Sequence, residues 1–185
     1  MGDYENAFIK CFIKMDVLLG SNEGKKEMTE INRSSGQKQS PLMQILKGEN
    51  NGGDGEEELA LDSKGCTANV VMIKDWVIYC ANAGDSRAVI CNRGIAENLS
   101  EDHKPDNKIE WDRIYKAGST VTDGRVDGNL NLSRSIGDLK HKQVKSLSPA
   151  EQPITCVPDI KVRKLKEGDE FILIACDGIW EQKSS

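Results

Sequence analysis

The sequence predicts an α+β fold in which one amphipathic helix precedes antiparallel strands and a few short helices. Three observations predict it. Apolar residues recur with helical spacing near the N-terminus, short apolar runs separated by tight turns fill the region after residue 65, and a polar segment lies between them. A chain of 185 residues is long enough to form one domain with a sizeable core.

The N-terminal residues 1–19 are expected to form a helix. Phe8, Phe12, Met15 and Leu19 stand at positions i, i+4, i+7 and i+11, which places them on one helical face. An apolar stripe of this kind needs a partner surface to cover it. We therefore expect this helix to pack against the remainder of the fold.

Residues 20–64 are predicted to be a flexible polar insertion. Glycine, serine, asparagine, lysine and glutamate dominate this segment, most densely over residues 48–58. Such a composition buries too little apolar area to offset the entropy lost on ordering. Only residues 41–47 are expected to form a short helix within it.

Residues 65–185 are predicted to form the sheet core. Apolar runs rich in β-branched residues alternate here with tight turns, a pattern typical of antiparallel strands joined by hairpins. The first runs, which should form a meander of neighbouring strands, cover residues 67–73, 76–83, 87–91 and 95–99. Residues 160–165 and 170–175 are expected to form the last strand pair.

Between these runs the sequence predicts a second helix and several loops. Residues 107–117 carry isolated apolar residues among charges and are followed by Gly118, a favourable residue after a helix C-terminus. Residues 120–136 contain repeated glycines and should form turns plus a strand. Residues 140–153 are polar and contain prolines, which favours a loop.

Charge and hydropathy exclude several classes of partner. A net charge of -5 provides no basic surface for nucleic acid or for an anionic membrane. No apolar stretch approaches the ~20 residues needed to span a bilayer, and the N-terminus has no secretory leader pattern. We expect a soluble, intracellular monomer, in the cytoplasm, the nucleus or both.

The cysteines favour a reducing compartment. Six cysteines are scattered along the chain without a C-x-x-C pair, and most lie inside apolar runs. This arrangement favours buried thiols over zinc ligands, which usually come in closely spaced pairs.

Aspartates at predicted strand ends are the candidate metal ligands. Asp177 follows the apolar run 171–176, which should be a strand buried on both faces, and Asp85 follows the run 76–83. Aspartate beside glycine is also an ordinary turn residue, so each one alone has a structural explanation. Carboxylates from several strand ends could nevertheless converge on Mg²⁺ or Mn²⁺, which prefer oxygen ligands. The other acidic candidates beside glycine are Asp123, Asp127 and Asp138.

No other catalytic arrangement competes strongly in the sequence. His103 and His141 lie in charged segments and are expected to be solvated, and the serines lack a G-x-S-x-G motif. Two alternatives stay open for three arginines near the turns: they bind phosphate, or they form ion pairs. These arginines are Arg87, Arg125 and Arg134.

Eight sequence blocks stand out along the chain: Gly65–Ala68, Ala81–Ala88, Asp102–Pro105, Arg113-Ile114 with Ala117-Gly118, Gly124–Gly128, Leu132–Asp138, Pro158-Asp159 and Ala175–Trp180. Their order is that found in the metal-dependent type 2C protein phosphatases, which residues 65–184 resemble. Residues 2–19 resemble the helix just upstream, and the polar insertion together with Asn129–Arg134 resembles the family's gamma isoform most closely.

The resemblance implies an α-β-β-α sandwich of two antiparallel sheets flanked by helices. It also implies hydrolysis of phosphoserine and phosphothreonine in phosphoprotein substrates by a water that bridges two Mg²⁺ or Mn²⁺ ions. By matching position, Asp177 is a core metal ligand and Asp85 binds an additional metal. Arg125, Arg134 and Asp138 match motifs near the site, where we assign them a scaffolding role.

The sequence also departs from the family pattern. The family's Asp-Gly-His-Gly-Gly segment and its terminal Asp-Asn are not found in these residues, and Glu181 stands where many members have a second aspartate. We therefore expect residues 1–185 to be a partial type 2C phosphatase domain in which only Asp177 remains of the core metal ligands. Three explanations stay open: a fragment of an active phosphatase, a catalytically inactive binding module, or an incomplete gene product.

Overall fold

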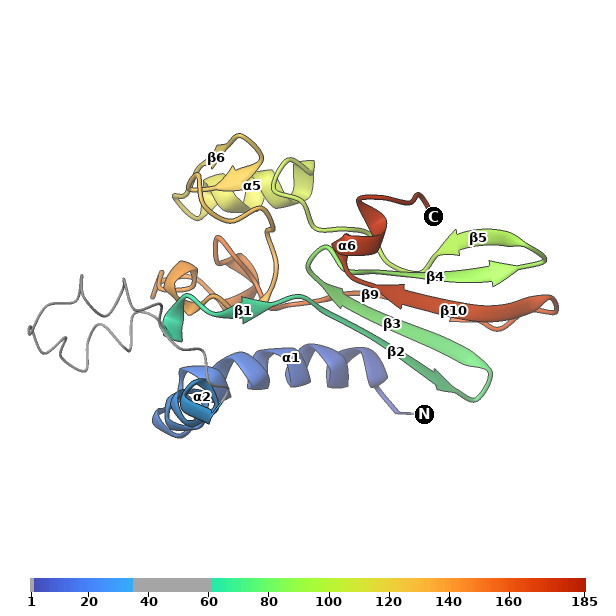
Figure 1. The fold of residues 1–185 in the computed structure, drawn as a ribbon, viewed down its shortest axis with the longest axis horizontal. Helices are drawn as coiled ribbons and strands as arrows, with labels where there is room; N and C mark the ends of the chain where they lie inside the picture. Colours follow the sequence, from blue (N-terminus) through green and yellow to red (C-terminus); the bar gives the residue numbers. More distant parts are fainter. Residues whose placement is uncertain (1, 35–60) are drawn as a thin grey trace, which may run out of the picture.

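The computed structural model describes residues 2–34 and 61–185 and confirms the α+β class (Figure 1). The α-helices are α1 Tyr4–Gly20, α2 Asn22–Ser34, α5 Lys108–Lys116 and α6 Asp177–Trp180, with 3-10 turns η1 Leu139–His141 and η2 Pro149–Glu151. The strands are β1 Gly65–Cys66, β2 Ala68–Lys74, β3 Val77–Ala83, β4 Arg87–Asn92, β5 Ile95–Asn98, β6 Val121–Thr122, β7 Arg125–Val126, β8 Ile136–Gly137, β9 Asp159–Lys164 and β10 Asp169–Ala175. The short helix expected over residues 41–47 lies outside the described residues.

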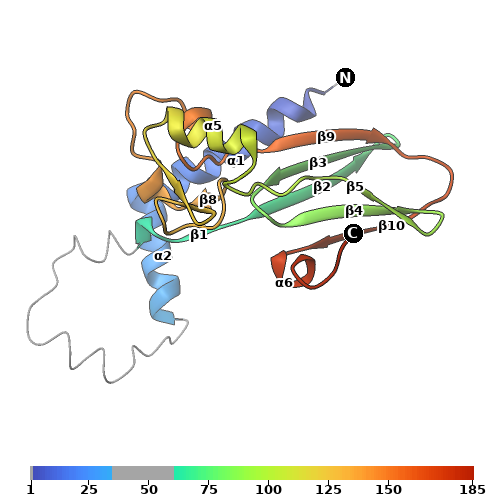
Figure 2. The same cartoon turned by 90° about the horizontal axis from the view of Figure 1, so that it is seen from above.

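Two three-stranded antiparallel sheets form the centre of the fold. One has the order β2-β3-β9 and the other the order β10-β4-β5, and Figure 2 shows them face to face. Ile78 and Cys80 of β3 share a buried cluster with Ala88 and Ile90 of β4. The sandwich arrangement follows, because each sheet covers the inner face of the other.

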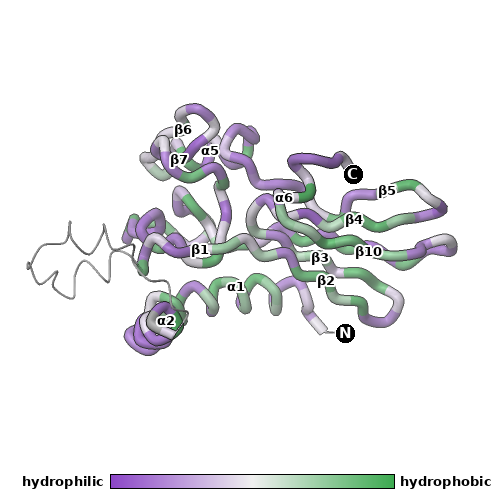
Figure 3. Tube along the Cα trace, in the orientation of Figure 1, coloured by the Kyte–Doolittle hydropathy of each residue, from purple (hydrophilic) through white to green (hydrophobic). Residues whose placement is uncertain are grey.

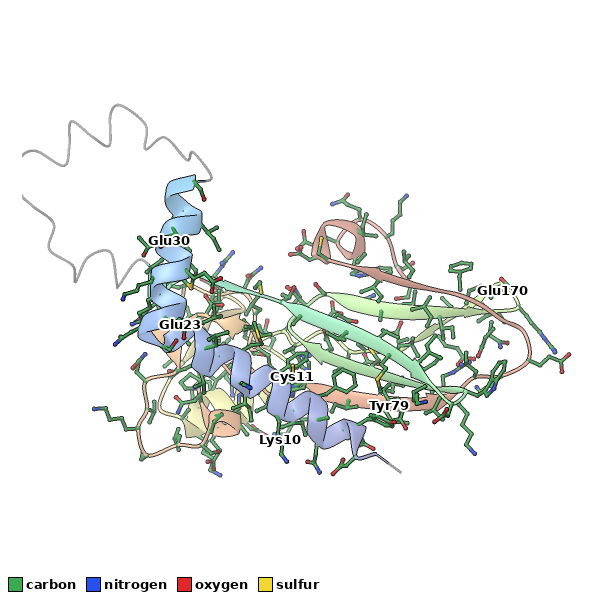
Figure 4. All side chains as sticks on the ribbon, turned by 90° about the horizontal axis from the view of Figure 1, so that it is seen from below. Lys10, Cys11, Glu23, Glu30, Tyr79 and Glu170 are labelled. Carbon is green, nitrogen blue, oxygen red and sulfur yellow. The ribbon has the colours of Figure 1, made fainter. Side chains whose placement is uncertain are left out.

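Helix α1 covers the outer face of the β2-β3-β9 sheet. Its N-terminus is capped by Asp3, whose side chain accepts a hydrogen bond from the Asn6 amide. Phe8 and Phe12 pack against β3 and its neighbours. Figure 4 shows α1, which carries Lys10 and Cys11, on the same side of this sheet as Tyr79 of β3. The helix predicted over residues 1–19 therefore forms and buries part of its stripe, although Met15 is exposed.

The predicted meander is wrong between β3 and β4. Strand β3 pairs with β2 and β9, whereas β4 pairs with β5 and β10. The turn over residues 84–86 therefore carries the chain from one sheet to the other. The last strand pair is wrong for the same reason, because β9 and β10 belong to different sheets. Local hairpin signals predict strands well, but burial of both inner faces decides which strands pair.

Residues 22–34 of the predicted flexible segment 20–64 form helix α2, while residues 35–60 lie outside the described residues. The Ser21 hydroxyl accepts from the Gly24 amide at 3.1 Å, and the Ser21 carbonyl accepts from the Lys25 amide. This N-terminal cap precedes a run rich in lysine and glutamate, which are good helix formers. Lys25 also forms an ion pair with Asp62 at 3.4 Å. Ser21 is a helix-capping residue that the sequence shows, but the low hydropathy of the segment favours a prediction of disorder.

Strand β10 is less buried than the sequence predicts. Ile172 packs against the core between the sheets, while Phe171 and Leu173, which alternate with it, are 59% and 45% exposed. Figure 3 shows that this strand is nevertheless mostly hydrophobic. The expectation of burial on both faces is therefore wrong for this strand.

A smaller cluster joins α5 to the hairpin β6-β7. Ile114 of α5 is buried with Val121, Val126 and Ile154. Helix α5 begins and ends within one residue of the predicted bounds. This cluster holds α5 beside the segments that follow it, which carry several charged residues of the candidate site.

The cysteine prediction is correct only in part. All six thiols are free, and Cys80 and Cys156 are buried, but Cys11, Cys66 and Cys176 are exposed. Apolar neighbours in sequence do not ensure burial, because side chains on one element point in different directions. None of the helices in the described ranges is long and apolar enough to cross a membrane.

Candidate functional site

Asp85 and Asp177 lie at the same end of two neighbouring strands, β4 and β10. Arg87 begins β4 and pairs with Ala175, which ends β10. Asp85 precedes the first of these residues by two positions and Asp177 follows the second by two positions. Because the strands are antiparallel neighbours, both aspartates leave the sheet at one end, where Figure 1 shows α6. The expected meeting of two strand-end carboxylates is thus consistent with the topology.

The two carboxylates differ in their surroundings. Asp85 is only 4% exposed, and its Oδ2 lies 2.5 Å from Nζ of Lys104. Asp177 is half-buried and is the first residue of α6. Trp180 anchors this short helix, because its Nε1 donates to the carbonyl oxygen of Ala175 at 2.7 Å. Both aspartates are therefore attached to fixed backbone.

Three consecutive residues hold the turn that carries Asp85. Asp102 accepts two hydrogen bonds from the Arg87 guanidinium at 2.9 and 3.0 Å. His103 is hydrogen-bonded to Gly84, and Lys104 is paired with Asp85. We call Asp102–Lys104 the clasp segment. The sequence predicts only a charged loop for these residues and does not indicate that all three contact the turn around Asp85.

Both histidines correct the expectation that they are solvated. The His103 side chain is 4% exposed and bonds to Gly84 and Asp159. The His141 side chain is 10% exposed, and burial lowers its pKa. Polar neighbours in sequence misled the prediction, because a loop that folds back into a sandwich can bury an imidazole that has hydrogen-bond partners.

Arg87 and Arg134 form ion pairs with acidic side chains. Of the two alternatives for these arginines, phosphate binding and ion pairing, the structure shows ion pairing. Arg87 binds Asp102 and also lies over the Trp180 ring, with its guanidinium carbon 5.3 Å from the ring centroid. Arg134 pairs with Glu110 at 2.6 Å. Arg125 instead donates to the carbonyl oxygen of Asn129 at 2.9 Å.

Glu110 is the centre of a buried ionic network that the sequence did not reveal. Only 2% of this residue is exposed, yet its carboxylate accepts from Arg134, from Arg113 at 2.6 Å and from Ser133 at 2.6 Å. Burial opposes its ionisation, but the hydrogen bonds and charges of the two arginines lower its pKa to about 2. The only sequence signal was the Glu110 and Arg113 pair at helical spacing.

Asp159 connects this network to the clasp segment. Its Oδ1 accepts from Arg134 at 2.7 Å, and its Oδ2 lies 3.1 Å from Nε2 of His103. The hydrogen bond from His103 and the charge of Arg134 hold the pKa of Asp159 well below its ordinary value. A chain of contacts therefore runs from Glu110 to the turn at Gly84.

The remaining acidic candidates have turn geometry. Asp123, Asp127 and Asp138 have φ values of 51°, 48° and 50°, in the left-handed region that aspartate tolerates. Asp127 accepts from the Thr120 amide at 3.0 Å. Within residues 2–34 and 61–185, no group of three or more acidic, histidine or cysteine residues could hold a metal ion. Convergence of several strand-end aspartates on one cluster is therefore not found there.

A pair of carboxylates still has the chemistry that Mg²⁺ requires. Mg²⁺ keeps several waters and is commonly held by one or two carboxylates together with substrate phosphate. Asp85 and Asp177 are carboxylates at the same end of two neighbouring strands, and Asp85 is paired with Lys104. They do not form a closed cage of protein ligands.

The fold is a sandwich of two antiparallel sheets with aspartates at the same end of two neighbouring strands, and comparison with known proteins identifies the family. The family profile of Protein phosphatase 2C matches residues 13–185. The chain is 44% identical over 178 residues to Probable protein phosphatase 2C 4 of Paramecium tetraurelia, covering 96% of this chain and 52% of that protein. The chain belongs to the protein phosphatase 2C family.

Other relatives agree. Protein phosphatase 2C homolog 2 of Schizosaccharomyces pombe is 50% identical over 131 residues, which cover 70% of this chain and 35% of that protein. A crystal structure of a phosphatase from Toxoplasma gondii is 41% identical with a TM-score of 0.54, covering 57% of this chain and 33% of the other. The chain thus spans about half the length of the curated relatives it matches.

Proposed function

We propose that this chain is part of a metal-dependent protein serine/threonine phosphatase that removes phosphate from phosphoserine and phosphothreonine in phosphoproteins. The observation that carries the proposal is that Asp85 and Asp177 lie at the same end of two neighbouring strands in a chain of the protein phosphatase 2C family. The family resemblance implies Mg²⁺ or Mn²⁺ as cofactor.

Asp177 and Asp85 are the metal ligands in this proposal. When bound, the ions supply Lewis acidity for attack on the phosphate. The protein's own contribution is positional: α6 holds Asp177, and the clasp segment holds the Asp85 turn. Lys104 balances the charge of Asp85, so a cation at this carboxylate competes with the ammonium group.

We further propose that the 185 residues hold only part of the catalytic site. The chain covers 52% of the Paramecium relative, and the described residues offer no group of three metal-ligand side chains. We also propose, from residues 129–134 and the polar insertion, that the chain resembles the gamma isoform of the family. The alternative, a phosphatase-like binding module without activity, agrees with the same incomplete ligand set.

Turnover of a phosphothreonine peptide with Mn²⁺ separates these functions. The 185 residues alone should show none, because two carboxylates leave most metal coordination to water. A longer chain that adds the family's Asp-Gly-His-Gly-Gly and Asp-Asn segments should turn over and lose activity on Asp177→Ala. Asp112→Ala is the matched control, because Asp112 forms an exposed pair with Lys108.

One result would contradict the proposal of a partial site, and another would contradict the proposal of a phosphatase. Full metal-dependent turnover by the 185 residues would show that the site is complete without the additional segments. An inert longer chain that still binds phosphoproteins would instead favour the binding module.

A further inference from the structure

His103 is buried, charged residues surround it in the sequence, and the proposed reaction leaves it without a role. Its two ring nitrogens face different parts of the molecule. Nδ1 lies 3.2 Å from the amide nitrogen of Gly84, the residue before Asp85, and Nε2 lies 3.1 Å from Oδ2 of Asp159. The imidazole therefore stands between the Asp85 turn and the buried ionic network.

The hydrogen bonds around Gly84 indicate which nitrogen of His103 carries the proton. The carbonyl oxygen of Gly84 already accepts from the His103 amide at 3.1 Å and from Nδ2 of Asn82 at 3.0 Å. Nδ1 lies 3.2 Å from both the amide nitrogen and the carbonyl oxygen of Gly84. Because that oxygen already has two donors, we assign Nδ1 as the unprotonated acceptor of the Gly84 amide. The proton then lies on Nε2, which donates to the Asp159 carboxylate. This is a neutral imidazole with a defined tautomer.

We propose that His103 is a positioning residue for Asp85: its neutral, Nε2-protonated ring holds the Gly84 amide and thereby fixes the turn that presents the carboxylate. The proposal rests on the proposed metal-binding role of Asp85. His103 does not contact the carboxylate of Asp85, which is paired with Lys104. It acts through the backbone.

At its other end His103 contacts Asp159, whose side chain is 66% exposed. Asp159 is also bound by Arg134, which is 7% exposed and is bound in turn by Glu110. The Ser133 backbone amide completes the support, since it donates to the His103 carbonyl oxygen at 3.1 Å. The ring is thus fixed on one side by the network and fixes the Asp85 turn on the other.

Nitrogen NMR of the 185-residue chain tests the tautomer without any substitution. We expect Nδ1 of His103 to resonate as an unprotonated imidazole nitrogen and Nε2 as a protonated one, with a scalar coupling or cross-peak linking the Gly84 amide to Nδ1. A protonated Nδ1 would overturn the proposal, because it could not accept from Gly84.

Two substitutions separate positioning from space filling. In His103→Asn the side-chain oxygen takes the place of Nδ1, and in His103→Gln the amide reaches the place of Nε2 instead. Paramagnetic broadening of the Asp85 amide signal by Mn²⁺ measures binding at the turn. We expect His103→Gln and His103→Ala to need about tenfold more Mn²⁺ for the same broadening, and His103→Asn to stay near the unsubstituted chain.

His141→Gln is the matched control, since it removes the other buried imidazole and should leave the broadening unchanged. If Asn and Gln substitutions at His103 weaken Mn²⁺ binding equally, the positioning role is wrong. If the unsubstituted chain shows no broadening at Asp85, the metal role of Asp85 fails. Two other measurements then test whether His103 positions the turn. The proposal requires the tautomer given above and faster hydrogen exchange of the Gly84 amide in His103→Gln than in His103→Asn.

Discussion

At Glu110, burial and charge act in opposite directions on one side chain. Desolvation favours the neutral acid, whereas two arginines and a serine favour the carboxylate. The pKa of about 2 shows that the hydrogen-bonded charges prevail. Such a group stabilises the folded state above the pKa of the unfolded chain and loses that effect as the pH falls toward 2.

Glu110 should therefore contribute to acid sensitivity. Its carboxyl pKa falls from 4.5 to about 2 on folding, which corresponds to about 3 kcal/mol of unfolding free energy that disappears below pH 4.5. Glu110→Gln should lower stability at pH 7 by about 3 kcal/mol, because buried Arg113 loses its carboxylate partner and Arg134 keeps only Asp159. The substitution should also make the free energy of unfolding fall less steeply between about pH 5 and pH 2, because the glutamine does not titrate.

Urea unfolding at pH 7 and pH 3 measures both effects. Asp159 has a lowered pKa as well and loses its stabilising effect in the same direction, so some decline should remain in the Glu110 variant. An unchanged pH dependence in Glu110→Gln would show that the network does not hold this carboxylate ionised.

At the scale of elements, a buried ion pair and a hydrogen bond from a backbone amide attach α1 to β8 and to the segment after it. Asp16 of α1 accepts from Nζ of Lys142 at 2.6 Å and from the Gly137 amide at 2.7 Å. Apolar contacts of Phe8 and Phe12 hold the remainder of the helix. The helix is thus fixed by one polar anchor and one apolar stripe.

Loss of this anchor should be much more harmful than loss of a surface pair. We expect Asp16→Ala to lower the unfolding free energy by about 3 kcal/mol, because Lys142 is left buried and without its carboxylate partner. Asp112→Ala removes an exposed pair with Lys108 and should change it by at most about 0.5 kcal/mol. Urea midpoints of the two variants decide this, and similar losses would argue against the anchor.

At the scale of the whole molecule, the two sheets differ in how deeply their strands are enclosed. Strand β3 is paired on both sides, and α1 covers one face of its sheet while the second sheet covers the other. Strand β10 pairs with β4 and carries the exposed Phe171 and Leu173. Stability against local opening should follow this difference.

Amide hydrogen exchange should show the gradient. Amides of β3 should exchange the most slowly, at rates near those of global unfolding, and amides of β10 should exchange faster because fewer contacts must break to open that strand. Exchange measured by NMR or mass spectrometry on the 185-residue chain checks the order. Equal protection of β3 and β10 would show that both sheets open only together.

The sequence by itself determined most of the elements and indicated two candidate metal ligands. Helix α1, the strands of residues 65–185 and α5 follow from periodicity and turn residues, which are local properties. The strand-end aspartates Asp85 and Asp177 were also evident, because a carboxylate after an apolar run is a local pattern. The ordered motifs also indicated the protein phosphatase 2C family, which the comparisons show, since several spaced blocks rarely occur together by chance.

Only the tertiary structure decided which strands share a sheet, where Glu110 and His103 lie, and how the clasp segment holds the Asp85 turn. His103 is 19 residues from Gly84 and 56 from Asp159 in sequence. Its neighbours along the chain are charged, yet its neighbours in space bury it. Burial and hydrogen-bond partners depend on packing between distant segments, so composition around His103 predicted solvent exposure where the folded sandwich supplies two specific partners.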